Sequence, residues 1–285
     1  MVQNDTSICF VALARDCAKH LPKFRSILEN FDQAGLQWRA VVGENDSKDG
    51  TREILNKYCE EDSRIELVDT SLMSKISGRL PRMAFGRQLL LEVIKKKNYS
   101  SVDYVVVIDI DNVINPDIDT KVFEKSFDVL KENKFFAVSA TSVPFYYDLI
   151  ALRDGIHNTS DIISNLNKLG RSPLNYYFYH KNVLYPMQKQ IADRGSFECQ
   201  SAFNGLCIYP YDKYVSGSYY EGNGKDVCEH VIFNEVLNEL YGGNVFACSD
   251  LRVNVPKDHA MQSFAVFFMN RLIKMTRRMV GKISL

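Results

Sequence analysis

The protein has 285 residues, of which 46% are hydrophobic and 25% are charged, so it is long enough to bury a substantial core and has the composition of a globular protein. Its 35 lysines and arginines balance 35 aspartates and glutamates, which gives a formal net charge of +0. A neutral chain lacks the basic footprint of a protein that binds nucleic acid. We therefore expect no nucleic acid partner and expect any charged ligand to be met by a local group of residues.

The spacing of the cysteines and the N-terminal sequence indicate in which cellular compartment the protein is expected. The 7 cysteines are dispersed and form no CxxC pair, which indicates reduced thiols in the cytosol rather than a disulfide framework or a zinc site. The sequence begins MVQNDTSICFVALARDC, which lacks the basic-then-apolar order of a signal peptide. No apolar run approaches the roughly 20 residues that span a bilayer. These features predict a cytoplasmic protein.

The first half of the chain alternates strand-like and helix-like segments. Short apolar runs predict strands and apolar residues at helical spacing predict helices. Strands that alternate with helices indicate an α/β fold with a Rossmann-like, mostly parallel central sheet flanked by helices. The predicted strands are 7–15, 38–45, 64–70 and 103–111, and the predicted helices are 20–35, 49–61 and 82–97.

The second half is less regular. A polar, tyrosine-rich segment, 154–182, reads as an insertion or mobile loop region that faces a substrate. On either side of it the pattern of strands and helices resumes. The predicted elements are a helix at 123–132, a strand at 135–143, a strand within 203–214, a glycine-containing turn at 217–227, a helix at 228–243 and a strand at 244–253.

Several polar residues follow predicted strands directly. In doubly wound sheets, ligands bind in the crevice beyond the carboxyl ends of the strands. Arg15, the segment 44–47 and the segment 109–111 each lie at such an end. We therefore expect them to converge on one edge of the sheet.

The stretch VVVIDID, 105–111, places Asp109 and Asp111 at alternate positions at the end of an apolar strand. In extended backbone, alternate side chains point to the same side, and two buried carboxylates are costly unless their charge is compensated. A hard cation such as Mg²⁺ or Mn²⁺, completed by substrate phosphates and water, would compensate it. The alternative is that both aspartates are strand-end caps or surface charges.

Two enzyme families have such a pattern. It resembles the DxD of GT-A glycosyltransferases, which holds a divalent metal on the diphosphate of a sugar nucleotide. It also resembles the hhhhDxDx[TV] motif of haloacid-dehalogenase-type phosphatases, in which the first aspartate, here Asp109, is the nucleophile. The phosphatase motif normally opens its domain and is followed by a second acidic cluster. Here about a hundred residues precede the motif, and the strand at 244–253 has the single acid Asp250, so the flanks favour the glycosyltransferase.

A longer resemblance lies towards the C-terminus. SAFNGLCIYPYDKY, 201–214, followed by KDVCEHVIFN, 225–234, is similar to the xAFGGLxIY…CEHVxF pattern of the capsule-associated, α-mannosyltransferase-like branch of GT-A enzymes. Asn204 stands where that pattern has glycine. The resemblance implies one GT-A catalytic domain over 1–260, with a nucleotide-sugar-binding half at 1–120 and an acceptor-binding half at 121–260. It also implies transfer of a hexosyl or pentosyl group from a nucleotide-diphosphate sugar to a hydroxyl of a glycan acceptor.

The resemblance implies roles for particular residues in binding the donor. It implies metal ligands at Asp109, Asp111 and His259, with Mn²⁺ or Mg²⁺ as the metal, and Asp109 also faces the nucleotide sugar. The remaining donor-binding candidates are Arg15, Glu44, Asp46, Arg79 and Arg87. Turn and helix-cap roles are the alternative for the acids of 43–51, a solvated helix face is the alternative for the arginines, and we expect it for Arg82.

The resemblance places a carboxylate near the acceptor at the start of a helix. Glu229 would be the general base of an inverting enzyme or an acceptor-binding group of a retaining one, with Asp226 in reserve. The alternative for Glu229 is an acid that complements the helix macrodipole. A third class, a non-catalytic carbohydrate-binding protein, is disfavoured because the carboxylates are intact.

The segment 261–285 combines apolar residues with Arg271, Lys274, Arg277, Arg278 and Lys282. This pattern predicts a basic amphipathic helix. Such a helix can lie peripherally on an anionic membrane surface, or it can pack on its own domain or on a partner subunit.

Overall fold

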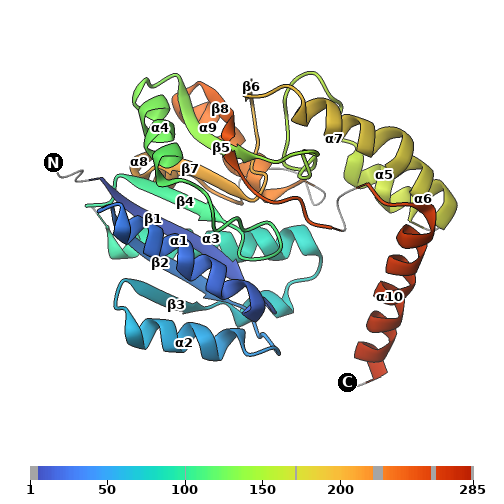
Figure 1. The fold of residues 1–285 in the computed structure, drawn as a ribbon, viewed down its shortest axis with the longest axis horizontal. Coiled ribbons are helices and arrows are strands. Elements are labelled where there is room, and N and C mark those ends of the chain that lie inside the picture. Colours follow the sequence, from blue (N-terminus) through green and yellow to red (C-terminus); the bar gives the residue numbers. More distant parts are fainter. Residues whose placement is uncertain (1–5, 100, 171, 221–226, 258–260, 284–285) are drawn as a thin grey trace.

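The computed structural model describes residues 6–283 except 100, 171, 221–226 and 258–260. Eight strands form one sheet in the order β3-β2-β1-β4-β7-β5-β8-β6, flanked by helices (Figure 1). The strands are β1 (Ser7–Ala14), β2 (Gln37–Glu44), β3 (Ile65–Asp69), β4 (Tyr104–Ile108), β5 (Phe135–Thr141), β6 (Phe197–Cys199), β7 (Leu206–Pro210) and β8 (Asn244–Arg252).

Ten α-helices lie in the described part of the chain. They are α1 (Leu21–Gln33), α2 (Thr51–Glu61), α3 (Arg79–Lys97), α4 (Thr120–Lys131), α5 (Ile162–Leu169), α6 (Pro173–Tyr179), α7 (Tyr185–Ala192), α8 (Tyr211–Ser216), α9 (Glu229–Tyr241) and α10 (Phe264–Ile283). Three short helical segments accompany them: η1 (Ala18–His20), η2 (Ser71–Lys75) and the π-helical η3 (His180–Leu184).

The sheet is mostly parallel, as predicted. Four strand pairs are parallel, namely β1 with β2, β1 with β4, β2 with β3 and β5 with β8. The other three are antiparallel, and two of them involve β7, which lies between β4 and β5. Strands from both predicted halves of the chain therefore form a single sheet.

Alternation along the strands produces two cores, one on each face of the sheet. Ile8 and Phe10 of β1 belong to the core under α1, α2 and α4, whereas Cys9 and Val11 belong to the core under α3 and α9. This is the expected result for a strand buried on both faces, because successive side chains point to opposite sides.

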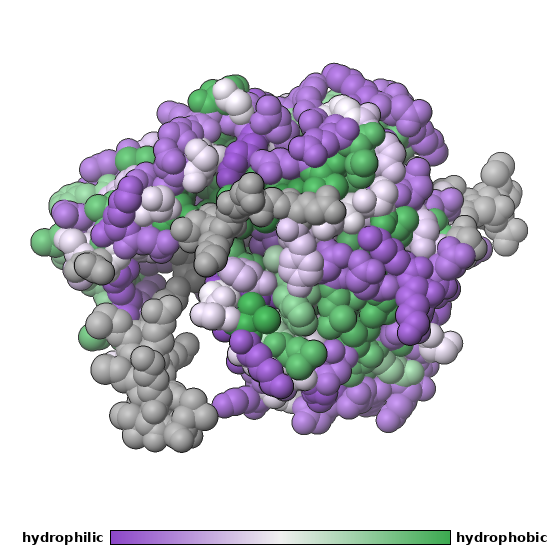
Figure 2. All heavy atoms as spheres, turned by 180° about the vertical axis from the view of Figure 1, so that it is seen from behind, coloured by the Kyte–Doolittle hydropathy of each residue, from purple (hydrophilic) through white to green (hydrophobic). Residues whose placement is uncertain are grey.

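The rear of the molecule is covered largely by hydrophilic side chains, with hydrophobic areas between them (Figure 2).

The segment 154–182 differs from the expectation of a mobile loop. The structure forms α5 and α6 there, and η3 and α7 continue the helical path. Ile162, Tyr177 and Leu184 are buried, and Pro173 opens α6 at a position where its missing N–H is tolerated. The loop prediction was wrong because the tyrosines that made the segment look irregular are packing residues.

Some boundaries also differ from prediction. β4 ends at Ile108, so Asp109 and Asp111 lie in the loop after the strand rather than within it. The helix α3 begins at Arg79 and α10 begins at Phe264, three residues from each predicted start. No helix of the described chain is both long enough and apolar enough to cross a membrane.

Phe31 provides a test of the core on the face of the sheet that α1 covers. Its fully buried ring lies edge-on to Phe10 at 5.1 Å and to Phe123 at 4.9 Å, which joins α1, β1 and α4. We expect Phe31→Ala to lower the free energy of unfolding by about 3–5 kcal/mol, because it removes a buried ring and leaves a cavity. Urea denaturation measures this change. Leu72→Ala, at a residue that is 53% exposed, should change it by less than about 0.5 kcal/mol, and equal losses would contradict the assignment.

Candidate functional site

The parallel pairing of β2, β1 and β4 sets the location of the site. Ala14 at the end of β1 is paired with Glu44 at the end of β2, and Val11 is paired with Val107 near the end of β4. The carboxyl ends of these three strands therefore share one edge of the sheet. This confirms the prediction that Arg15, the 44–47 segment and the 109–111 segment lie along the same edge.

Arg87 is the centre of the charged cluster at this edge. It projects from α3, is 3% exposed, and its Nη2 donates to Oδ1 of Asp109 at 2.8 Å. Its Nε donates to Oε1 of Glu229 at 3.3 Å, and the guanidinium carbon lies 4.9 Å from the centre of the Phe203 ring. Arg87, which the sequence predicts as a donor contact, is a buried cation that joins a strand end to a helix start.

The loop after β4 presents the two aspartates in different ways. The backbone N–H of Asp109 donates to the carbonyl of Gly205 at 2.9 Å, and its side chain is 29% exposed. Asp111 is exposed, and its Oδ1 accepts from the Val113 N–H at 3.0 Å. Asp109 thus faces the buried arginine, while Asp111 faces outward and fixes the turn.

Burial and charge set the protonation behaviour of the cluster. Burial opposes the charge on Arg87, but Asp109 and Glu229 outweigh that cost and raise its pKa above the ordinary value. Burial, with a contribution from Asp111, raises the pKa of Asp109 even though Arg87 opposes the shift. Burial lowers the pKa of His230 well below its usual range, so this imidazole is neutral at pH 7. It stacks on Phe203 with ring centroids 3.6 Å apart.

Asp148 is a member of the cluster that the sequence did not reveal. Burial and the negative charges of Asp109 and Glu229 raise its pKa to about 7. Its backbone N–H donates to Oδ1 of Asn204 at 3.3 Å, which positions it beside the loop that carries Gly205. It follows a stretch with no motif, so only the fold brings it to the other carboxylates.

The two motifs of the longer resemblance meet at this cluster. Gly205 has φ +82°, and a Cβ there would lie 2.5 Å from the Tyr147 hydroxyl oxygen, so only glycine fits. Asn204 has φ +48°, a left-handed conformation that asparagine accepts more readily than most residues. Glu229, the acid of CEHV, is the first residue of α9 and is 5% exposed. It therefore both complements the helix dipole and pairs with Arg87.

The predicted donor-binding residues at the ends of β1 and β2 include buried and exposed ones. Glu44 is fully buried, forms an ion pair with Arg52, and accepts from the Ser47 N–H at 2.7 Å, so it holds the β2–α2 loop in place. Arg15 and Asp46 are exposed beside it. Asp49 accepts from the Ala18 N–H and from Thr51, the first residue of α2, which supports a turn and cap role for that acid.

The remaining candidates are placed as follows. Arg79 is exposed at the first residue of α3. Arg82 donates to the Ile76 carbonyl at 3.1 and 3.2 Å, so it fastens the start of the helix rather than lying on a solvated face. Asp226 and His259 lie outside the described residues.

The described residues of the cluster do not form a complete metal site by themselves. In the part of the chain that the structure describes, no three His, Cys, Asp or Glu side chains are grouped so that they could hold a metal ion, and His259 lies outside it. Mg²⁺ is commonly held by one or two carboxylates together with substrate phosphates. Asp109 and Asp111 are the carboxylates that would supply hard oxygens to such a metal, and the positive charges near the cluster are those of Arg87 and Arg79.

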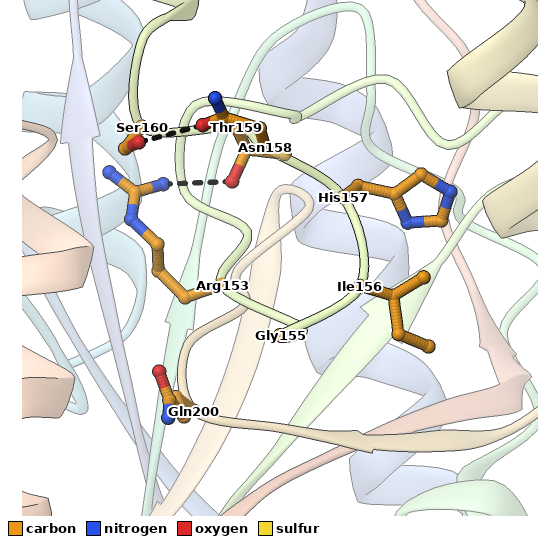
Figure 3. Close-up of a pocket in the computed structure, with 8 residues that line it drawn as sticks. All are labelled: Arg153, Gly155, Ile156, His157, Asn158, Thr159, Ser160 and Gln200. Atoms are coloured by element: carbon orange, nitrogen blue, oxygen red, sulfur yellow. Dashed lines mark hydrogen bonds between the residues drawn. The ribbon is translucent and has the colours of Figure 1, made fainter.

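A separate cavity of about 300 Å³ lies in the 153–160 loop (Figure 3). The Arg153 guanidinium reaches its wall, but its Nη1 already donates to the carbonyls of Ile150 and Leu152 and to the Thr159 hydroxyl. The arginine therefore fastens the loop. The carboxylate cluster remains the candidate site.

The pKa of Asp148 gives a pH-dependent prediction. Between about pH 4 and 7 the folded state holds a proton on Asp148 that the unfolded state releases, so this residue makes the protein less stable as pH rises. Asp148→Asn removes the charge. We expect the variant to exceed the wild type in free energy of unfolding by about 2–4 kcal/mol at pH 8, with little difference near pH 4.

Urea denaturation with a chelator present, at pH 4.5, 6 and 8, measures this difference. Asp128→Asn provides the control, because that carboxylate is 72% exposed and forms only an i,i+3 ion pair with Lys131. A stability difference for Asp148→Asn that does not change with pH would contradict the prediction.

No protein-family model and no curated protein matches the sequence. Solved structures with a similar architecture include mannosyl-3-phosphoglycerate synthase from Rubrobacter xylanophilus, with 16% identity, a TM-score of 0.47, and coverage of 98% of this chain and 76% of that one. S. aureus TarS 1-349 has 11% identity, a TM-score of 0.49, and coverage of 88% and 60%. Mannosyltransferase PcManGT from Pyrobaculum calidifontis, in complex with GDP-Man and Mn²⁺, has 15% identity, a TM-score of 0.46, and coverage of 88% and 57%.

This chain thus spans about three fifths of the length of the TarS fragment and of PcManGT. Identities of 11–16% and TM-scores below 0.5 describe a distant likeness of architecture. Such a likeness does not assign an activity, a donor or an acceptor to this chain.

Proposed function

We propose that the protein is a metal-dependent glycosyltransferase of the GT-A type, which transfers a hexosyl or pentosyl group from a nucleotide-diphosphate sugar to a hydroxyl of a glycan. The observation that carries this proposal is the carboxylate cluster at the carboxyl edge of the sheet. Asp109, Asp111, Asp148 and Glu229 influence one another around a single buried cation, Arg87. A cluster of carboxylates suits a divalent cation that in turn binds a diphosphate.

Asp109 and Asp111 would hold Mn²⁺ or Mg²⁺, with His259 as the proposed third ligand. The metal would stabilise the charge on the departing nucleoside diphosphate. Arg79, exposed at the start of α3, is suited to the phosphates because a guanidinium contacts them in bidentate fashion. Arg15 and Asp46, exposed beyond β1 and β2, are suited to the nucleoside, and Glu44 keeps their loop in position.

Glu229 is the proposed general base. Its carboxylate is buried, and it is paired with Arg87 through Oε1. A base that takes the proton from an acceptor hydroxyl must be held within hydrogen-bond reach of it, and the ion pair with Arg87 fixes its orientation. Asp226 is the reserve candidate for this role.

Donor binding provides the first test. A ligand that binds only the folded state at one hundred times its dissociation constant adds about 2.7 kcal/mol of stability, which raises the melting temperature of a chain this size by roughly 5 °C. We expect such a shift with one family in a panel of GDP- and UDP-sugars when Mn²⁺ or Mg²⁺ is present, and no shift with chelator. Asp111→Asn should abolish it.

The asparagine at 111 can still accept the Val113 N–H, so the turn is preserved. Asp117→Asn is the matched control, because this aspartate is exposed in the same loop and should leave the shift unchanged. Unaltered donor binding by Asp111→Asn would overturn the metal assignment. A metal-independent shift without turnover would favour a non-catalytic carbohydrate-binding protein, and a phosphorylated Asp109 would favour the phosphatase.

The role of Glu229 has its own test. We expect Glu229→Gln to lower kcat by about 10²- to 10⁴-fold with the donor Kd unchanged, because the amide cannot take a proton. Initial rates of sugar transfer and donor titration by calorimetry measure the two quantities. Glu235→Gln, on the exposed side of the same helix, should leave both unchanged. A normal kcat with a raised KM for the acceptor would assign Glu229 to acceptor binding instead.

A further inference from the structure

The described contacts of the C-terminal helix α10 with its own domain lie on the side that carries Phe267. The Phe267 ring is 9% exposed and lies 5.2 Å from the ring of Tyr177 and 5.4 Å from that of His180. Arg271 donates to the Gly170 carbonyl at 2.8 Å and lies 4.2 Å from the centre of the Tyr176 ring. These contacts fasten the first half of α10 to α6 and to its neighbours.

A second side of α10 is apolar and exposed. At 100° per residue, four apolar residues cover about 120° of the helix surface, away from the side that carries Phe267. Figure 1 shows α10 projecting away from the rest of the molecule, with only its N-terminal part beside α6. The four are Val266 (41% exposed), Met269 (56%), Leu272 (63%) and Ile273 (41%).

The charge of this segment is of one sign only. Residues 261–285 include five basic residues, at positions 271, 274, 277, 278 and 282, and no acidic residue. By helical periodicity, positions 271, 274, 278 and 282 fall on the same side as Phe267, opposite the exposed apolar residues, and position 277 falls at the edge of the apolar face. The segment thus has an exposed apolar face, and its opposite side carries the contacts with α6 in the first half of the helix and basic positions along its length.

We propose that α10 binds the surface of an anionic lipid bilayer through the face formed by Val266, Met269, Leu272 and Ile273. A helix with this division lies in the interfacial plane, with its apolar side among the acyl chains and its cationic groups near acidic headgroups. A second copy of the chain fits the surface less well, because two such helices would bring five positive charges each and no acid. The proposal does not depend on the transferase activity.

Cosedimentation of the whole protein with vesicles tests this directly. We expect binding to vesicles that contain phosphatidylserine to be at least about tenfold tighter than to phosphatidylcholine alone, since each basic residue near an anionic surface contributes to affinity. Binding should weaken as salt rises, because the screening length falls from about 10 Å at 0.1 M to about 3 Å at 1 M.

Two variants separate the apolar and the basic contributions. Met269→Gln with Leu272→Gln should weaken binding roughly tenfold, because two apolar side chains no longer enter the lipid. Arg277→Gln with Arg278→Gln should weaken binding roughly tenfold to the anionic vesicles only. Leu240→Gln is the matched control, since Leu240 on α9 is 57% exposed and should bind as the wild type does.

Sedimentation velocity without lipid completes the test. A monomer that binds anionic vesicles supports the proposal. Equal binding to both vesicle types, or binding that Met269→Gln with Leu272→Gln does not change, would overturn it. A dimer that this same variant dissociates, with no vesicle binding, would assign the face to a second copy instead.

Discussion

The ion pairs of Arg87 hold the candidate site together. This one side chain joins α3 to an aspartate 22 residues later and to a glutamate 142 residues later. A buried charge is costly without partners, and removal of one partner leaves the other charge uncompensated. Arg87 therefore joins the start of α9 to the end of β4 through contacts between segments that are far apart in the sequence.

The same contact makes the site chemically uneven. One carboxylate oxygen of Asp109 accepts a hydrogen bond from Arg87. Burial and the negative charges of Asp109 and Glu229 raise the pKa of Asp148 to about 7. Asp111, two residues from Asp109, is exposed to solvent. The cluster therefore contains a paired carboxylate, a partly protonated one and an exposed one at the same sheet edge. Different environments thus give chemically similar carboxyl groups of one site different pKa values.

The sequence predicted most of the strands and helices because their apolar residues recur with the period of each element. The carboxyl edge was also predictable, since parallel strands must end together. The antiparallel insertion of β7 between β4 and β5 was not, because the order of strands depends on pairing between distant segments. For the same reason the burial of Arg87 and the contribution of Asp148 were missed. An arginine in a helix and an aspartate after a tyrosine pair carry no local signal of their partners.

The residue pair Asn204 and Gly205 shows what a motif can encode. Position 204 needs a left-handed backbone, which asparagine adopts at modest cost, and its amide donates to Ser142 and accepts from the Asp148 N–H. An asparagine in place of glycine therefore adds two contacts that hold the loop carrying Asp148. Position 205 allows no such exchange, because a Cβ would collide with Tyr147 and with Val113. The Gly205 carbonyl accepts a hydrogen bond from the N–H of Asp109, so the glycine backbone helps to position the site. Glycine is required at 205 because there is no room for a side chain.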